Sequence, residues 1–337
     1  MQRLNKLSTY VLVILSLAFP IAGNAQKHKK DKANERAENQ PAVIWRDPGR
    51  VSELNLMYGA GGSEHAPDPH GVFTFVEEDK SGTSAKFDVK DANGVEWRVK
   101  LGAEPQSETA ATRLLWAAGY FVDEDYYLPE IKVEGLEKLH RGENYVSEGG
   151  IVRGARLKRK DKQIKKIGNW DWFKNRFLGT KEMNGLRVMM ALLNNWDLKE
   201  INNAIYVGGG EQRYVVSDVG ASFGKTGNSI SRSKGDVKGY ERSKFIGKET
   251  ATEVDFEMHS RPFVLTAVNV PNYRTRSKME EITKHIPRQD AKWIGQLLGQ
   301  LSEEQIRDCF RSAGYTAEEV DDYTAEVQSR IAELKSL

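Results

Sequence analysis

NNWDLKEINN, residues 194–203, is the stretch on which the interpretation of this 337-residue chain depends, together with the DVG that begins at Asp218. Asp197 and Asn202 are five residues apart, so on a tight loop both side chains can face one cavity. The run RYVVS before Asp218 favours a β-strand, which would hold this carboxylate rigidly at a strand end. Gly220 would then allow a sharp turn. The D-x-x-x-x-N pattern alone is a weak signal, because Asp and Asn are ordinary turn residues.

The upstream segment predicts a small antiparallel sheet. Residues 71–76 and 86–89 alternate apolar and polar side chains on either side of a polar turn at 80–84, which is typical of a hairpin. The Asn-Gly pair at 93–94 indicates a second tight turn, and a third strand is expected at 95–101. Three antiparallel strands follow from this pattern.

A helix is predicted directly after the sheet, over residues 107–119. Its apolar residues recur at helical spacing, and Gly119 ends it: Ala111, Leu114, Leu115 and Ala118. Lys100 ends the third strand, and Glu108 lies in the first turn of the helix. Taken singly, both could be surface residues, because Lys and Glu are mostly exposed in proteins. Their order along the chain is the informative feature.

The order of these motifs resembles that of HipA-type kinases, relatives of the phosphoinositide-kinase-like fold. The resemblance covers roughly residues 71–224 and depends on four motifs: Gly82-x-x-x-Lys86, Val99-Lys100, Glu108-x-x-x-x-Arg113-Leu114, and N-x-D-x-x-x-x-N at 195–202. It implies an α+β, two-lobed protein-kinase-like fold, with a small antiparallel-sheet N-lobe and a mostly helical C-lobe. It also implies an ATP-dependent phosphotransferase that uses Mg2+ and a hydroxyl-bearing acceptor, which is a protein, a glycan or a small molecule.

The resemblance assigns a role to each residue of these motifs. Asp197 is the expected catalytic base, and Asn202 and Asp218 are the expected metal ligands. Lys100 would neutralise the nucleotide phosphates, and Glu108 would orient the flexible lysine. Because backbone N–H groups and hydroxyls suit anionic oxygens, six residues are expected to bind the nucleotide: Ser81, Gly82, Thr83, Ser84, Lys86 and Lys100.

Two departures from the motifs of standard protein kinases narrow the class of kinase that the sequence suggests. The turn at 81–84 contains one glycine rather than a G-x-G-x-x-G loop, and no His lies two residues before Asp197. These departures exclude a standard eukaryotic-type protein kinase. Nucleotidyl transfer between the same lobes and a catalytically inactive pseudokinase that serves as a binding module remain as alternatives.

A different class is suggested by GASFG, which is centred on Ser222 and fits the G-x-S-x-G elbow of secreted serine esterases. An elbow needs a helix after the turn, yet residues 225–235 are rich in Gly and Ser and favour a loop. The downstream histidines are His259 and His285, and Asp255 lies only four residues before the first of them. This spacing is short for an acid and base of that fold.

The N-terminus predicts export. A basic start at 1–6, an apolar run at 7–21 and small residues at 22–25 form a signal peptide over 1–25. The apolar run is short for a membrane span and contains polar residues, which disfavours an uncleaved anchor. Residues 26–40 are polar and charged, so a disordered linker is expected there. The mature protein is expected to be periplasmic or extracellular, with no stable membrane anchor.

Composition limits the partners. The chain has 50 basic and 48 acidic side chains, a balance that gives no reason to expect nucleic acid as a partner. Cys309 is the only cysteine and lies in a predicted helix, where a buried thiol is the default. The six scattered histidines form no zinc-type spacing. A monomer is expected.

The folded part is divided here into an N-lobe at 41–150 and a C-lobe at 151–337. Within the C-lobe, the basic stretch 156–166 is followed by Trp170 and Trp172. A solvated loop is the commonest structure for such a stretch, and a docking surface for an acidic or glycan substrate is the alternative.

Helices are expected to dominate the C-lobe. Residues 181–193 have an apolar stripe that leads directly into the segment 194–203. Further helical runs are predicted from residue 286 to the end of the sequence, including a capped start at Ser302.

Overall fold

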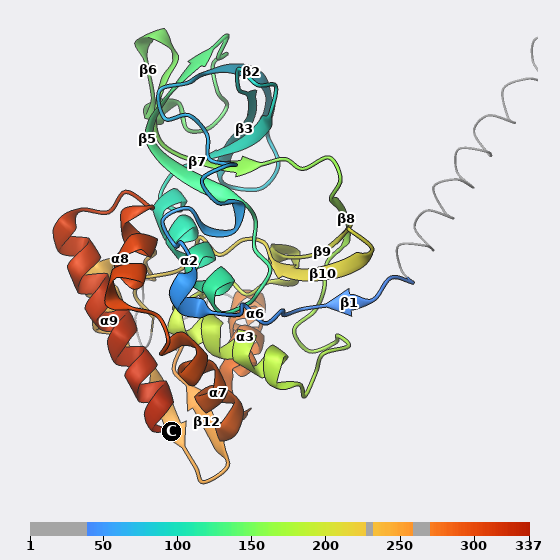
Figure 1. Ribbon diagram of the computed structural model, residues 1–337, viewed down its shortest axis with the longest axis vertical. Helices are drawn as coiled ribbons and strands as arrows, with labels where there is room; N and C mark the ends of the chain where they lie inside the picture. Colours follow the sequence, from blue (N-terminus) through green and yellow to red (C-terminus); the bar gives the residue numbers. More distant parts are fainter. Residues whose placement is uncertain (1–38, 227–231, 259–269) are drawn as a thin grey trace, which may run out of the picture.

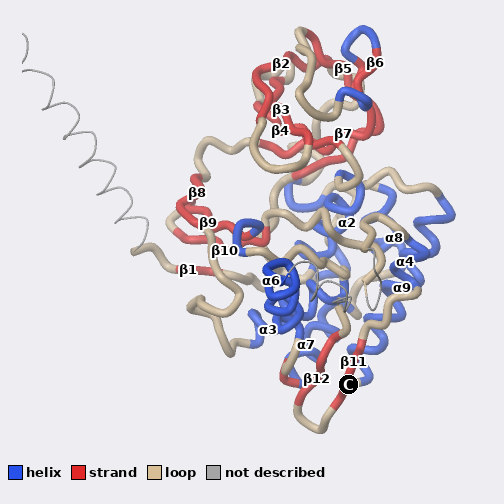
Figure 2. Tube along the Cα trace, turned by 180° about the vertical axis from the view of Figure 1, so that it is seen from behind, coloured by secondary structure: helices blue, strands red, loops and turns tan. Residues whose placement is uncertain are grey.

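The chain folds into two lobes, which Figure 1 shows one above the other. The computed structural model describes residues 39–226, 232–258 and 270–337, so the predicted signal peptide and nearly all of the predicted linker lie outside the described residues. Strands gather in the upper lobe and helices in the lower one, as the view from behind also shows (Figure 2). The predicted α+β, two-lobed architecture is confirmed.

The small lobe is a barrel. Its strands lie in the order β4-β3-β2-β5-β7-β6, and an additional pairing of β4 with β7 closes five of them into a ring. The strands are β2 (Val72–Asp79), β3 (Ala85–Lys90), β4 (Glu96–Leu101), β5 (Asp125–Glu134), β6 (Val146–Ser147) and β7 (Ile151–Arg159). Pairing is antiparallel throughout except between β2 and β5, which run parallel. The predicted hairpin and third strand form part of this barrel.

Alternation along the strands separates an apolar interior from a charged exterior. Phe87, Val99 and Leu157 are fully buried inside the barrel. The neighbouring residues on the same three strands point the other way, because successive side chains of a strand alternate in direction. Lys100 therefore has Lys86 and Arg156 as its register partners on the outer face.

The predicted lobe boundary at residue 150 lies too early. Strand β7 pairs with β4 and β5 and belongs to the barrel, so the small lobe continues to Arg159. The stretch 156–166 is therefore not a solvated loop, since its first part is this strand. Trp170 and Trp172 are 3% and 4% exposed and belong to the core of the large lobe, so neither can serve a docking surface.

Helix α2 (Pro105–Ala117) joins the two lobes. Its apolar residues Ala111, Leu114 and Leu115 belong to the core of the large lobe, although the helix directly follows the barrel strand β4. The helix begins at Pro105, two residues earlier than predicted, because the first turn of a helix accommodates proline. Gly119 follows its end with a φ of +86°, as a helix stop requires.

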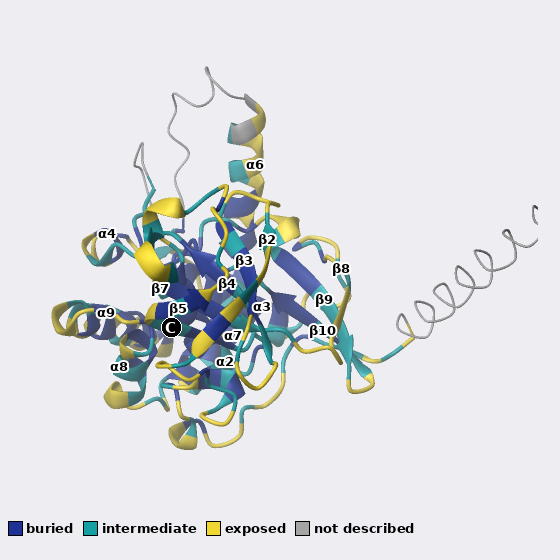
Figure 3. Cartoon of the chain, turned by 90° about the horizontal axis from the view of Figure 1, so that it is seen from above, coloured by how far each residue is buried: buried dark blue, intermediate teal, exposed yellow. Residues whose placement is uncertain are grey.

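The large lobe contains most of the helices. They are α3 (Lys181–Leu192), α4 (Val237–Glu241), α6 (Val270–Glu280), α7 (Arg288–Leu298), α8 (Glu303–Arg311) and α9 (Ala317–Ser336). Ser302 caps α8 through a full capping box, and Cys309 is buried within that helix, as predicted. Figure 3 shows buried residues toward the centre of the molecule and exposed ones along α6.

Two small sheets complete the large lobe. One has the order β1-β10-β9-β8, and the other has the order β11-β12-β13. Their strands are β1 (Ala42–Val43), β8 (Lys165–Gly168), β9 (Asn203–Gly208), β10 (Glu211–Val216), β11 (Ile246–Glu249), β12 (Glu253–Phe256) and β13 (Ile286–Pro287). β1 pairs in parallel with β10, so the start of the predicted N-lobe belongs to the large lobe. Among the described residues, no helix is long and apolar enough to span a bilayer.

Candidate active site

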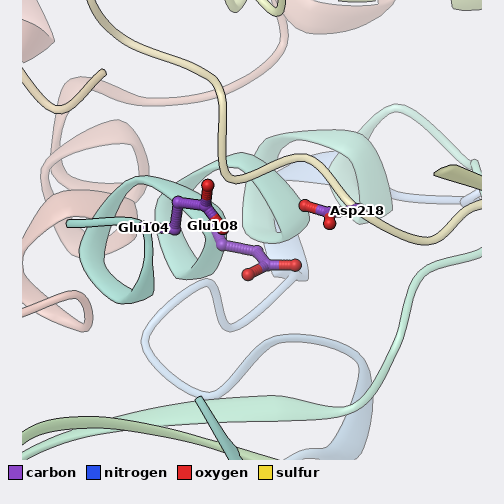
Figure 4. A group of neighbouring side chains, drawn as sticks. All are labelled: Glu104, Glu108 and Asp218. Carbon is purple, nitrogen blue, oxygen red and sulfur yellow. The ribbon is translucent and has the colours of Figure 1, made fainter. Parts of the chain in front are cut away.

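The barrel, the start of α2 and the segment after β10 bring three carboxylates together around Lys100. The Lys100 Nζ atom lies 2.5 Å from Glu104 Oε2, 2.9 Å from Glu108 Oε2 and 3.3 Å from Asp218 Oδ1. Figure 4 shows that both glutamates come from the start of α2, and that Asp218 approaches from the loop after β10. The structure therefore brings Lys100, Glu108 and Asp218 together, and Glu108 contacts the lysine that it was predicted to orient.

Burial differs sharply within this cluster. The side chains of Lys100 and Glu108 are 5% and 2% exposed, whereas that of Asp218 is 44% exposed. Lys100 and Glu108 can therefore act as fixed charges within the protein. Asp218 remains accessible to a ligand that enters from solvent.

The carboxylates determine the charge of the lysine. Burial alone would lower the pKa of Lys100, but Glu108, Asp218 and Glu104 raise it above its ordinary value. Lys100 is therefore held as a cation. Burial raises the pKa of Glu108, and the attraction of Arg156 and Lys100 offsets part of that rise.

A second buried cation, Arg156, contacts the same glutamate as Lys100. Arg156 NH2 lies 3.4 Å from Glu108 Oε1, and Arg156 Nε donates to Asp125 Oδ2 at 2.8 Å. Arg113 NH1 reaches the other oxygen of Asp125 at 3.1 Å. Glu108 is thus held between two cations, which fixes its direction toward Lys100.

Several of these residues escaped prediction. Glu104 lies one helical turn before Glu108, a spacing that could have indicated it. Arg156 looked like one cation in a basic run, and no sequence signal separates it from its neighbours. Lys234, which contacts Glu104 Oε1, lies in a Ser- and Gly-rich loop without any periodic pattern.

Gly220 permits a close approach between its segment and the residue before α2. Its φ is not in the left-handed region, and the chain bends at the next residue, Ala221. A Cβ atom at Gly220 would lie 2.7 Å from Cβ of Glu104, so a larger residue would push α2 away. Ser107 Oγ donates to the Gly220 carbonyl at 2.7 Å, which ties α2 to the segment that carries Asp218.

The segment 194–203 lies against the Asp218 segment through backbone contacts. The Asp218 N–H donates to the Asn202 carbonyl at 3.2 Å, and the Trp196 N–H donates to the Ala221 carbonyl at 3.3 Å. The Asn202 side chain donates to the Asp197 carbonyl at 2.6 Å. Hydrogen bonds to backbone carbonyls therefore link Asp197, Asn202 and Asp218 into one unit.

The donor set of this unit fits a magnesium ion. Asn202 uses its amide nitrogen on Asp197, which leaves the amide oxygen as its metal-binding atom. Asp218 supplies a carboxylate that remains partly exposed. Mg2+ prefers oxygen ligands and keeps several waters, so an amide oxygen and one carboxylate suffice on the protein side.

The Asp197 carboxylate is partly exposed and paired. Its Oδ1 atom lies 2.6 Å from Lys199 Nζ, and the Asp197 N–H donates to Asn195 Oδ1 at 3.1 Å. Burial and then Arg276 lower the pKa of Arg232 to about 10, and the attraction of Asp197 opposes them. The expected base is therefore paired with Lys199, and its charge also acts on Arg232.

The turn between β2 and β3 reaches the cluster at one residue. Ser84 Oγ donates to Glu104 Oε2 at 3.2 Å. Ser81 Oγ instead donates to Asp79 Oδ1 at 2.6 Å, and Lys86 Nζ lies 3.8 Å from Asp79 Oδ2. Ser81, Gly82 and Thr83 are exposed, and Arg141 holds the Gly82 carbonyl.

The serine esterase alternative, centred on Ser222, lacks the geometry of a nucleophile elbow. Ser222 is fully buried, and its hydroxyl has no hydrogen-bond partner among the described residues. The described residues after Gly224 form a loop until α4, so no helix follows the turn directly. His285 is exposed and lies 3.2 Å from Glu253, while His259 is outside the described residues.

The charges around Glu104 predict a specific pH dependence of stability. Burial would raise its pKa, but Lys100 and Lys234 lower it from 4.5 to about 2. A lowered pKa stabilises the fold above the unfolded value, and that stabilisation is lost as pH falls from about 4.5 to 2. We expect the loss to be about 3 kcal/mol.

Urea unfolding at neutral and acidic pH measures this effect. Other carboxylates also respond to acid, so the informative quantity is the difference between the wild type and Glu104→Gln. That difference should shrink as the pH is lowered. An unchanged difference between the two proteins at pH 7 and pH 3 would contradict the assignment.

Comparisons with known proteins give matches only among solved structures. No family model matches the chain, and no curated protein matches it. It is similar to a proinflammatory kinase, CtkA, from Helicobacter pylori, with 12% identity and a TM-score of 0.38 over 78% of this chain and 93% of that one.

Two structures of the Golgi casein kinase are also similar. The form with Mn and ADP bound is 8% identical, with a TM-score of 0.40 over 86% of this chain and 76% of that one. Another is 10% identical, with a TM-score of 0.33 over 85% and 78%. Likenesses this distant leave the activity to be inferred from the chain's own residues.

Proposed function

We propose that this protein is an exported atypical kinase of the HipA type, which transfers a phosphoryl group from ATP to a hydroxyl acceptor. The observation that carries the proposal is the contact of the buried Lys100 with both Glu108 and Asp218, at 2.9 and 3.3 Å. The contact joins β4 and α2, whose residues are eight positions apart, to a segment 118 residues further along the chain. A buried cation with a fixed carboxylate and an accessible carboxylate suits the charge of a nucleotide and its metal.

Each residue has a defined part in the proposed reaction. Lys100 attracts the phosphate oxygens, and Glu108 keeps its ammonium in place. Asn202 and Asp218 hold Mg2+, which neutralises phosphate charge when bound. Asp197 accepts the proton of the acceptor hydroxyl as the oxygen bonds to the γ-phosphorus, the bond to the bridging oxygen breaks and ADP leaves.

One observation favours the alternative of a binding module without turnover. Glu104 makes the shortest contact with Lys100, at 2.5 Å, so a phosphate would have to displace this carboxylate. If Glu104 stays in place, the lysine is already neutralised and binds no phosphate. The two candidates differ in whether Mg2+-dependent ATP binding leads to phosphate transfer.

The deciding experiment is a thermal shift of the purified mature protein with ATP and Mg2+, beside Asp218→Ala. A ligand at 100 times its dissociation constant stabilises a protein by about 2.7 kcal/mol. We expect a metal-dependent rise in Tm that is lost in Asp218→Ala and kept in Ser222→Ala. No rise at millimolar ATP would refute the kinase proposal.

Radiolabelled ATP then separates the transfer chemistries. Label from the γ-phosphate on an acceptor supports phosphoryl transfer, whereas label from the α-phosphate indicates nucleotidyl transfer. Binding with neither product indicates the pseudokinase alternative. We also propose that the mature protein acts outside the cytoplasm, because residues 1–25 have the pattern of a signal peptide.

A further inference from the structure

A large cavity lies between the barrel and the sheet of the lower lobe. Its volume is about 780 Å3, and its walls include Lys158 on β7, Lys166 on β8, and Tyr206 and Arg213 on β9 and β10. In Figure 1, β7 lies above the β9–β10 pair on this side of the molecule. Lys100, Glu108 and Asp218 are not among its lining residues. The cavity is thus separate from the cluster described above.

Positive charge predominates in the cavity walls. Seven basic and four acidic side chains line it. Carboxylates outside the lining offset part of this difference, since Arg98 and Lys160 both contact Asp88, at 2.7 and 2.8 Å. Some of the cations in the cavity walls share one carboxylate partner. Arg46 and Arg213 both contact the single carboxylate of Glu211, at 2.7 and 2.6 Å. Cations sharing one carboxylate retain net positive charge, which attracts anions.

Lys158 and Lys166 are two of the cations that line the cavity. Lys158 Nζ lies 2.6 Å from Asp123, but Asp123 also lies 3.9 Å from the buried Arg156. Lys166 forms no ion pair within the described part of the chain. Burial lowers the pKa of Lys166, and repulsion from Lys158 lowers it further. An anion between the two lysines would relieve this repulsion.

Aromatic rings lie beside the cations. The guanidinium groups of Arg46 and Arg213 are each 5.4 Å from the centre of the Phe121 ring. Tyr206 accepts a hydrogen bond from Lys158 at 3.3 Å, and its ring lies 5.5 Å from the same ammonium. Trp116 and Tyr120 also line the cavity. The walls therefore offer flat apolar surface as well as positive charge.

We propose that this cavity binds a small organic phosphate that carries a ring, at a site distinct from the proposed nucleotide site. Cavities of roughly 300–1,000 Å3 suit ligands of this size. The phosphate would lie between Lys158 and Lys166, and the ring would contact Phe121 or Tyr206. This site does not require the Lys100 cluster to bind nucleotide.

Calorimetry with phenyl phosphate tests the proposal on the full mature protein. This probe combines a dianionic phosphate with a ring, whereas phenol lacks the charge and inorganic phosphate lacks the ring. We expect saturable binding of phenyl phosphate, with weaker binding of each partial probe. Absence of saturable binding at millimolar phenyl phosphate would overturn the proposal.

Matched variants locate the site. Lys166→Gln should weaken phenyl phosphate binding about tenfold, which is typical for loss of one charge-assisted hydrogen bond. Lys165→Gln changes the adjacent lysine, which does not line the cavity, and should bind as the wild type does. Equal affinities in Lys166→Gln and the wild type would overturn the assignment.

Two further arms separate this site from the proposed active site. Asp218→Ala should retain phenyl phosphate binding even if it loses the ATP shift. Conversely, Lys166→Gln should keep the metal-dependent rise in Tm with ATP. Loss of phenyl phosphate binding in Asp218→Ala would mean that the cavity is part of the nucleotide site, which overturns a distinct site while leaving the kinase proposal intact.

Discussion

Lys100→Met is expected to reduce phosphate transfer by about 100- to 1,000-fold, the usual cost of removing one preorganised charge partner from an active site. The ammonium is the single cation in contact with Glu104, Glu108 and Asp218 together. Methionine has a similar length and leaves these carboxylates to repel one another. Initial rates with radiolabelled ATP, at saturating Mg2+, measure the loss.

The same change should destabilise the fold by about 3 kcal/mol, because it removes one partner of a buried ion pair. Arg156 still contacts Glu108 in the variant, so the cost falls at the lower end of the usual range. Chemical denaturation measures it. Lys90→Met is the control, because Lys90 is an exposed lysine of the same barrel, 3.8 Å from Glu96.

A double variant tests whether Lys100 and Glu108 act as a pair. If they do, the total loss of stability in the double variant Lys100→Met/Glu108→Gln should be smaller than the sum of the losses in the two single variants. Additive losses would show that the two residues stabilise the protein independently. Unchanged transfer in Lys100→Met would remove the lysine from the proposed mechanism.

Asp197→Asn is expected to lower kcat by at least about 100-fold while leaving the ATP-dependent shift in Tm unchanged. The amide keeps the shape of the side chain but cannot accept the proton of an acceptor hydroxyl. Its backbone contacts with Asn195 and Asn202 are retained, so the metal ligands should stay in place.

Glu200→Gln provides the matched control for this prediction. Glu200 is an exposed carboxylate three residues further along the same loop, and its loss should leave kcat unchanged. A fall of similar size in both variants would indicate a general effect of charge near the loop. A variant Asp197→Asn with normal kcat would exclude Asp197 as the base.

Local pattern was enough to predict most elements that position the site. The strand that ends at Lys100, the helix that carries Glu108 and the helix before Asn194 all appear close to their predicted ranges. Alternation and helical spacing depend on neighbouring residues, so these signals are visible in the sequence. The prediction was wrong for β7, where charged side chains lie on the outer face of a strand. Its run of basic residues resembles the sequence of a solvated loop.

Local sequence pattern predicted the two-lobed α+β division, the first three strands of the small lobe with their turns, and the spacing of Asp197, Asn202 and Asp218. Three features depend on contacts made in the folded protein. Glu104 joins the cluster, Arg156 contacts Glu108, and Glu104 lies so close to Gly220 that no side chain fits there. The tertiary structure also decided the position of the cationic cavity, whose walls come from both lobes. These features depend on the approach of segments far apart in the chain, and the charge of a residue does not reveal which partner it will meet after folding.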